Sequence, residues 1–255
     1  MTSPLMATFE RELVLYRRLW QASVFSSFLL PLLFVLSIGV GVGGYVDANG
    51  GLDGVDYLSY IAPGVLITTA FQIGVGESTF PVLGGFKWVR SYHAMRATPV
   101  EPKHMVGGHL LYLMFRAVIA TAAFLIIVSL FGGIHSWWAP LTLPIAALVT
   151  ASVAAPVTAF AATIEDDSYF SLIFRFGVIP ATLFSGVFFP VEQLPAAVQP
   201  LAYASPLWHG VMLARACTLG EATPWPIWLH VTYLLVWAAA GVALAVWRFR
   251  KRLED

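Results

Sequence analysis

The 255 residues are 58% hydrophobic and only 11% charged, with a mean hydropathy of +0.78. Soluble globular domains carry about 25% charged residues, so this composition predicts an integral membrane protein. Fourteen basic and fourteen acidic residues cancel, which excludes nucleic-acid binding by bulk electrostatics, and the single Cys217 excludes an internal disulfide and a CxxC metal or redox motif.

Residues 1–21 are predicted to form an amphipathic helix at the membrane surface. Ser3 is a suitable N-cap, and Pro4 suits the first helical position. Apolar side chains then recur every three or four residues, at Leu5, Phe9, Leu13, Tyr16 and Trp20. We expect this interfacial helix to lie on the cytoplasmic leaflet, with membrane lipid as its partner.

Six apolar segments follow, at residues 22–44, 57–82, 104–131, 140–163, 171–189 and 225–247. A crossing needs about 20 residues, so each is predicted to span the membrane. The amino-terminal segment, the loop after the second span and the tail after the last span hold eleven of the fourteen basic residues. Because basic loops stay inside the cell, we expect both termini to be cytoplasmic. The chain is thus predicted to be an all-α integral membrane protein, one transmembrane domain over residues 1–255.

Residues 84–108 form the only long charged segment between the apolar blocks. Residues 86–97 lack Gly and Pro, which favours a helix of about three turns, too short to cross a bilayer. The predicted helix carries Phe86, Lys87, Trp88, Arg90, Ser91, Tyr92, Met95 and Arg96, with Trp88, Tyr92 and Met95 in one stripe. Two interpretations stay open: a solvated basic loop that only fixes topology, and a coupling helix that docks into another protein.

Residues 190–224 are predicted to form an outer, re-entrant helical hairpin. Two amphipathic pieces, residues 194–204 and 206–219, are too short to cross. Ser205 and Pro206 resemble a helix start, and Gly220 resembles a stop. Such a hairpin would cap the outer end of a pathway.

Glu77 and Arg116 are ionisable residues within the predicted spans, where each charge costs roughly 3 kcal/mol unless it is paired or wetted. Three interpretations stay open: a pair that transmits motion of the basic loop, a purely structural pair, and a proton relay. Arg175 is expected to neutralise the acidic turn at residues 165–167.

The sequence predicts no metal site and no catalytic set. The acidic turn has no second acidic motif, and the spacing of His93, His104 and His109 fits no common ligand pattern. Ser185 stands outside a GxSxG motif.

Three stretches carry a family resemblance: YLSYIAPGVL at residues 57–66, FSGVFFPVEQLP at 184–195 and QPLAYASPLWHGVMLAR at 199–215. With the order of spans and basic segments, they resemble the type-2 exporter permeases of the ATP-binding cassette (ABC) transporters, most of all the daunorubicin-resistance and nodulation-type permeases. The resemblance implies pairing with a second copy or a homologous permease and with a cytoplasmic ATP-binding subunit. It also implies that residues 86–97 are the coupling helix, and that ATP and Mg are bound by the partner, with no cofactor in this chain.

The sequence thus predicts a non-enzymatic permease subunit in the bacterial plasma membrane, moving an amphipathic substrate such as a drug, lipid, glycolipid or natural product. Candidates for the pathway wall are Phe71, Phe184, Phe188 and Phe189. One alternative is a stand-alone transporter driven by protons through Glu77, which would favour an internal repeat that the sequence does not show. The other, an intramembrane enzyme, lacks nucleophile and metal motifs.

Overall fold

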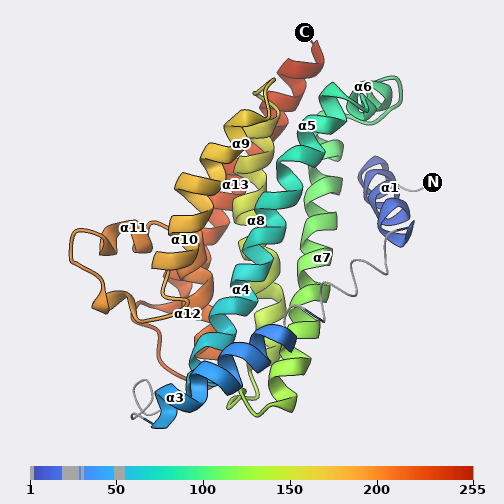
Figure 1. Cartoon of the computed structure of the whole chain (residues 1–255). Coiled ribbons are helices and arrows are strands. Elements are labelled where there is room, and N and C mark those ends of the chain that lie inside the picture. The colour runs from blue at the N-terminus through green and yellow to red at the C-terminus, as the bar shows by residue number, and fades with distance from the viewer. Residues whose placement is uncertain (1–2, 19–28, 30–31, 49–54, 255) are drawn as a thin grey trace.

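The computed structural model describes residues 3–18, 29, 32–48 and 55–254, and every element in this part of the chain is helical (Figure 1). Four helical segments are long and apolar enough to cross a membrane: Tyr57–Lys87 (α4 and α5), Pro102–Leu130 (α7), Ala139–Ala161 (η2 and α8) and Ile227–Glu254 (α13). Among the described residues, these candidates coincide with the second, third, fourth and sixth predicted spans. The basic residues predicted as a tail instead continue α13.

The first and fifth predicted spans correspond to shorter apolar helices. The first is Leu32–Ala48, which comprises η1 (Val35–Val42) and α3 (Gly43–Ala48), and the fifth is Ser168–Phe184. The fifth runs through α9 (Ser168–Leu172), η3 (Ile173–Val178) and α10 (Ile179–Phe184). It stops five residues before the predicted end because Gly186 takes a φ of 73°, in the left-handed region that glycine favours. Most of residues 22–31, as well as Trp20, lie outside the described residues, so six crossings stay a prediction.

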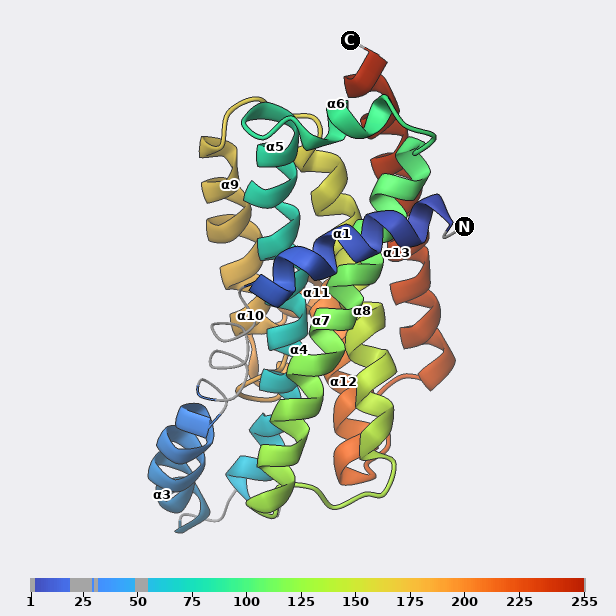
Figure 2. The same cartoon turned by 90° about the vertical axis from the view of Figure 1, so that its right-hand side faces the viewer.

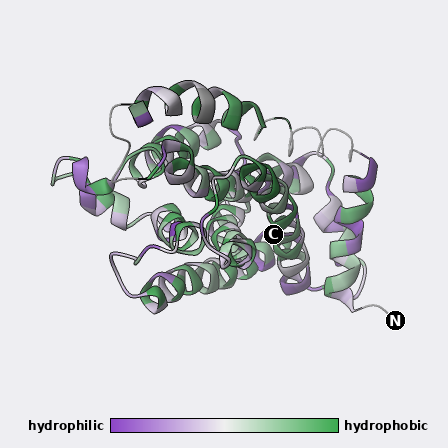
Figure 3. Cartoon of the chain, turned by 90° about the horizontal axis from the view of Figure 1, so that it is seen from below, coloured by the Kyte–Doolittle hydropathy of each residue, from purple (hydrophilic) through white to green (hydrophobic). Residues whose placement is uncertain are grey.

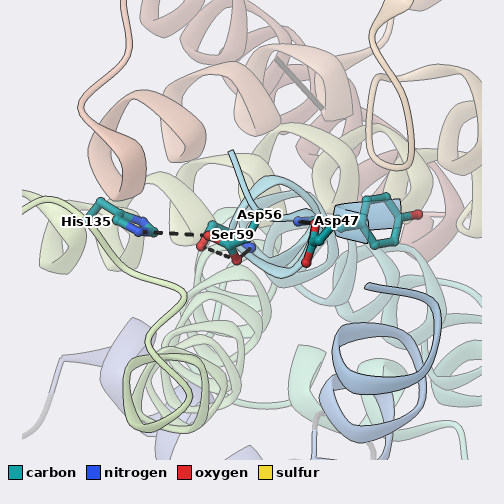
Figure 4. Close-up of polar contacts among 5 residues, drawn as sticks. Asp47, Asp56, Ser59 and His135 are labelled. Atoms are coloured by element: carbon teal, nitrogen blue, oxygen red, sulfur yellow. Dashed lines mark hydrogen bonds and ion pairs between the residues drawn. The ribbon is translucent and has the colours of Figure 1, made fainter. Parts of the chain in front are cut away.

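The first turn of α4 is fixed by polar side chains (Figure 4). Asp56 is the N-cap, and its carboxylate accepts hydrogen bonds from the backbone N–H of Ser59 at 3.0 Å and from the Ser59 hydroxyl at 2.9 Å. The carboxylate of Asp47, on α3, accepts a hydrogen bond from the backbone N–H of Tyr57 at 2.9 Å. The Nε2 of His135 lies 3.9 Å from the Oδ1 of Asp56. These contacts satisfy backbone donors that the start of a helix leaves unpaired.

Helix α4 (Tyr57–Ser78) and α5 (Phe80–Lys87) meet at a break. Thr79 leaves the helical region at φ −92° and ψ −98°, and its hydroxyl donates to the Gly76 carbonyl at 2.7 Å. Pro81 follows in the first turn of α5 and lacks the N–H that would bond to the carbonyl of Glu77. The second predicted span therefore consists of two helices.

Helix α1 (Pro4–Arg18) lies obliquely across α7 (Figure 2). Gly107 and Gly108 of α7 allow this close approach, because a Cβ on Gly108 would lie 2.6 Å from the Cβ of Thr8. Thr8 is buried, although its hydroxyl is polar, and it donates to the Pro4 carbonyl at 3.1 Å. The amphipathic helix expected over residues 1–21 is thus present as far as Arg18 and rests on protein; contact with lipid stays a prediction.

The outer segment differs from the predicted hairpin in two ways. Within residues 194–204, only α11 (Gln199–Tyr203) is α-helical. Helix α12 (Pro206–Leu219) has the expected bounds but is largely buried against α4, α8 and α13, in the half of the bundle away from the C-terminus (Figure 1). Gly210 allows this contact, because a Cβ there would lie 2.4 Å from Val149. Arg215, which lies within the predicted outer hairpin, is buried in α12.

The helices of the bundle are coloured mostly as hydrophobic, whereas the helix next to the N-terminus, α1, carries hydrophilic bands (Figure 3). Helix α8 (Thr142–Ala161) packs against α4, α7, α12 and α13. It touches α13 at Gly241, where a Cβ would lie 2.5 Å from the Cδ of Pro156. Helix packing in membranes depends on such small residues, because lipid tails are as apolar as the side chains.

Candidate functional site

The basic segment predicted as one helix over residues 86–97 is a helix-turn-helix corner. Helix α5 ends at Lys87, and α6 (Ser91–Arg96) begins after a turn in which Arg90 takes a positive φ of 54°. The single-helix prediction is therefore wrong. Nothing in its composition breaks the helix; the reversal instead lets Phe86 and Tyr92, on opposite sides of the turn, reach the same part of α13.

Three aromatic rings join this corner to the end of α13. The Phe86 and Tyr92 rings lie 4.6 Å apart, and Phe249 lies 4.8 Å from Phe86 and 4.9 Å from Tyr92. All three are buried, and burial raises the pKa of the Tyr92 hydroxyl. Such rings contribute about 0.5–1.5 kcal/mol per pair beyond the area they bury. The corner is therefore firmly attached to the last helix.

The tip of the corner faces outward. Trp88 is 57% exposed and Val89 is 73% exposed, so both apolar side chains are open to a partner or to lipid at this end of the bundle. Arg90 is exposed beside them. We name Trp88, Val89 and Arg90 the corner tip. The predicted stripe is incorrect, because Trp88 is exposed whereas Tyr92 is buried.

The other predicted coupling residues support the corner. Lys87 donates from Nζ to the Glu165 carbonyl at 2.7 Å and so joins α5 to the turn after α8. Ser91 and Met95 are half-buried, and Met95 packs against the cluster around Phe86. Arg96 is exposed and shares a shallow cavity with Arg250.

Glu77 and Arg116 form a hydrogen-bonded ion pair between α4 and α7. The Arg116 guanidinium also lies 5.8 Å from the centroid of the Tyr16 ring and 5.9 Å from that of Tyr112. Tyr16 belongs to α1, so the pair connects three helices. The pairing considered from the sequence is present, whereas its role in transmission stays a prediction.

Sequence reasoning missed the contribution of α1 to this charge centre. Glu12, on α1, is close enough to Glu77 for the two carboxylates to interact. Burial raises the pKa of Glu12, Arg11 offsets part of this rise, and Glu77 adds to it. The pairs Phe9–Phe115 and Tyr16–Tyr112 attach α1 to α7, with ring centroids 6.0 and 6.3 Å apart. Two features of the sequence could have indicated that α1 packs on α7. They are the spacing of Phe9 and Tyr16, which places both on one face of α1, and the Gly107–Gly108 pair in α7.

Arg175 does not neutralise the acidic turn. It is exposed on η3, and within the described ranges it forms no ion pair with residues 165–167. The turn is held instead by Lys87 and by Arg252, which donates to the carbonyls of Ala161 and Ile164 at 3.1 and 2.8 Å.

A cavity of about 530 Å³ opens between α4, α8, the α9–α10 segment and α13. Its wall is almost wholly apolar and includes two of the four predicted pathway residues, Phe71 and Phe184. Phe188 and Phe189 follow α10 and do not line it. We name this cavity the lateral groove. It suits an apolar chain better than an ion.

The described residues thus form a helical bundle with long apolar helices and a basic corner at one end, an architecture typical of integral membrane proteins. The chain belongs to the ABC-2 type transporter family, whose model matches residues 4–219. Permease subunits of this family are not themselves catalytic and normally pair with an ATP-binding subunit. The resemblance inferred from sequence is therefore confirmed, and the chain is a multi-pass inner-membrane permease subunit of an ABC transporter.

The particular relatives extend over most of the chain. Nodulation protein J of Rhizobium leguminosarum bv. viciae is 28% identical over 252 residues, covering 97% of this chain and 94% of the relative. Nodulation protein J of Rhizobium meliloti (strain 1021) is 28% identical over a stretch that covers 97% of this chain and 93% of that relative. The inner membrane transport permease YadH of Escherichia coli (strain K12) is 27% identical over 85% of this chain and 83% of its own.

Proposed function

We propose that this permease serves an ATP-driven exporter of amphipathic molecules and that a separate ATP-binding subunit, carrying ATP and Mg, docks on the corner tip. The observation that carries the proposal is that Trp88 and Val89 are exposed at the tip of the corner. The two helices of the corner, α5 and α6, pack on α13 through Phe86 and Tyr92. A rigid corner with an apolar, basic tip can transmit a push from a bound partner into the bundle.

The lateral groove supports the amphipathic cargo. It has room for an apolar chain, and residues of both α10 and α13 line it. Phe71 and Phe184 lie in its wall, so these two residues stay candidates for the pathway. Drugs, lipids, glycolipids and hydrophobic natural products share the required apolar part. A second permease, identical or homologous, would complete the pathway, with both termini in the cytoplasm.

The alternative, a proton-driven transporter that works alone through Glu77, is disfavoured. Glu77 is held in an ion pair with Arg116, and the family normally pairs with an ATP-binding subunit. Transport by the purified chain alone, driven by a pH gradient, would support this alternative.

The decisive experiment is co-purification of the chain with its ATP-binding subunit, followed by ATP-dependent export from reconstituted vesicles. Trp88→Ala and Arg90→Glu should break the complex and abolish export, and Arg96→Glu should weaken both. Lys251→Glu is the matched control, because Lys251 is exposed at the same end of the bundle and lies outside the corner tip. A complex that survives Trp88→Ala and Arg90→Glu together, with export intact, refutes docking at the corner tip.

A further inference from the structure

Arg215 is a cation inside the bundle, in the half opposite the corner tip. It is 8% exposed, and its Nη2 donates to the carbonyl oxygens of Gly186 at 2.9 Å and Tyr60 at 3.3 Å. The guanidinium lies 4.0 Å from the centroid of the Tyr60 ring. As far as the structure describes the chain, no Asp or Glu forms an ion pair with it.

The contacts of Arg215 hold the side chain but do not use all its donors. A guanidinium has five N–H donors, and the hydrogen bonds to the Tyr60 and Gly186 carbonyls both come from Nη2. The Nε donor is buried without a hydrogen-bond partner. Leaving a buried donor unpaired is unfavourable, more so for a charged group. Within the described residues, Arg215 is therefore a buried cation with no carboxylate in direct contact.

Arg215 lines a cavity of about 220 Å³. A single water molecule needs only roughly 10–15 Å³ of such space, so the cavity has room for a group of several heavy atoms. Tyr60, Trp208 and Met212 form part of the wall, and Pro190 and Pro224 lie at the segments that enclose it.

Two carboxylates share this cavity with Arg215. Glu192 and Glu221 both line it and both are exposed, whereas Arg215 is buried. Neither carboxylate forms an ion pair within the described ranges. A simple anion would be repelled by the two carboxylates, and a simple cation by Arg215. A group that carries both charges complements all three side chains.

We infer that this cavity binds a small zwitterionic group of the phosphoethanolamine class. Its acidic end lies against the Arg215 guanidinium, and its ammonium end lies at the exposed side, near Glu192 and Glu221. Guanidinium groups suit phosphate and carboxylate because the planar fork donates to two oxygens at once. The inference goes beyond the proposed function, because it requires neither ATP nor a partner subunit.

The first test measures binding of phosphoethanolamine, inorganic phosphate and ethanolamine to the purified full chain by calorimetry. Phosphoethanolamine should bind at least tenfold more tightly than either half. Arg215→Gln should weaken its binding at least tenfold. Phosphate binding as tight as phosphoethanolamine binding overturns the zwitterionic assignment.

A second pair of variants avoids the buried anchor, whose loss could disturb folding. The double variant Glu192→Gln/Glu221→Gln alters only exposed side chains, so it should weaken phosphoethanolamine binding and leave phosphate binding unchanged or tighter. Glu254→Gln, an exposed carboxylate change at the end of α13, should alter neither. Equal phosphoethanolamine affinity in the wild type and the double variant overturns the inference.

The same chemistry occurs in a lipid headgroup, and a second arm distinguishes this source. The chain in bilayer discs of phosphatidylethanolamine or phosphatidylglycerol is analysed by native mass spectrometry. Retention of phosphatidylethanolamine that Arg215→Gln removes assigns the site to lipid, whereas binding of soluble phosphoethanolamine alone assigns it to a soluble molecule or a cargo group. Binding of neither overturns the inference.

Discussion

The guanidinium of Arg252 lies over the ring of Phe86, 4.6 Å from its centroid, and so joins the last turn of α13 to α5. The same guanidinium donates to the last carbonyls around the end of α8. One side chain thus connects three segments beside the proposed docking surface. The end of α13 therefore packs against the corner and is not a solvated tail.

We predict that Phe249→Ala loosens the corner. Phe249 is fully buried between Phe86 and Tyr92, and removing such a ring costs about 3–5 kcal/mol. Thermal unfolding of the purified chain should show the loss, and partner binding should weaken with it. Leu244→Ala, at a 45% exposed position of the same helix, should cost less than about 1 kcal/mol. Equal losses for the two variants would contradict the role given to Phe249.

Breaking the Glu77–Arg116 pair should destabilise the contact between α4 and α7. Either Glu77→Gln or Arg116→Gln leaves a partly buried charge without its partner, at a cost of about 1–3 kcal/mol. The double variant should lose less than the sum of the two single losses, because the groups interact directly. A double-mutant cycle on unfolding free energies measures this coupling. Strictly additive losses would show that the pair contributes nothing as a pair.

The exchange of charges tests transmission separately from stability. If the pair only holds α4 and α7 together, Glu77→Arg with Arg116→Glu should restore both assembly and ATP-dependent export. If the order of the charges matters for transmission, assembly should return while export stays low. Failure to restore either would refute direct pairing as the reason for both charges.

Glu12 should make the attachment of α1 depend on pH. Its pKa is raised in the folded chain, so the folded state binds more protons than the unfolded state above the ordinary value of 4.5. Stability from this group is thus present at low pH and is lost as pH rises through the folded-state pKa. The difference in melting temperature between Glu12→Gln and the wild type should shrink from about pH 8 to about pH 5. Glu10→Gln, at an exposed position of α1, is the control and should show no such trend.

Two glycines provide a matched test of helix packing. Gly241→Ala should cost about 1–3 kcal/mol, because the added Cβ would lie 2.5 Å from Pro156 Cδ. Gly76→Ala meets no atom within 4 Å and should be neutral or stabilising by up to about 1 kcal/mol. Unfolding of both variants under identical conditions checks the sign. A stabilising Gly241→Ala would show that α8 and α13 can separate at little cost.

The sequence predicted the long helices well and the corner poorly. The apolar runs of α7, α8 and α13 are long enough for hydrophobic length alone to find them. The break at Thr79 was also visible in principle, because Pro81 removes a backbone donor, yet the apolar run concealed it. The residue type of Arg90 does not predict its positive φ. That backbone angle accompanies the packing of the neighbouring Tyr92 on Phe249 of α13.

Two charged residues show why the sites were harder to predict. The Glu77–Arg116 pair was accessible because charges in apolar spans require a partner. The burial of Arg215 could not be predicted from the sequence. It depends on the close approach that Gly210 allows and on contacts of α12 with helices far away in the sequence. The short, proline-flanked helix α12 had the correct bounds, but the sequence assigned it only to an outer re-entrant hairpin and gave no packing partners for it.

The break at Thr79 separates the long helix α4, whose first turn is fixed, from the short helix α5. Before the break, Asp56 and Asp47 fix the first turn of α4; after it, α5 packs against the end of α13. Eight residues of α5 make an arm of roughly 12 Å, so a swivel of about 10° at Thr79 would displace its far end by about 2 Å. Glu77 lies two residues before Thr79, so a small rotation at Thr79 would first alter the ion pair between Glu77 and Arg116.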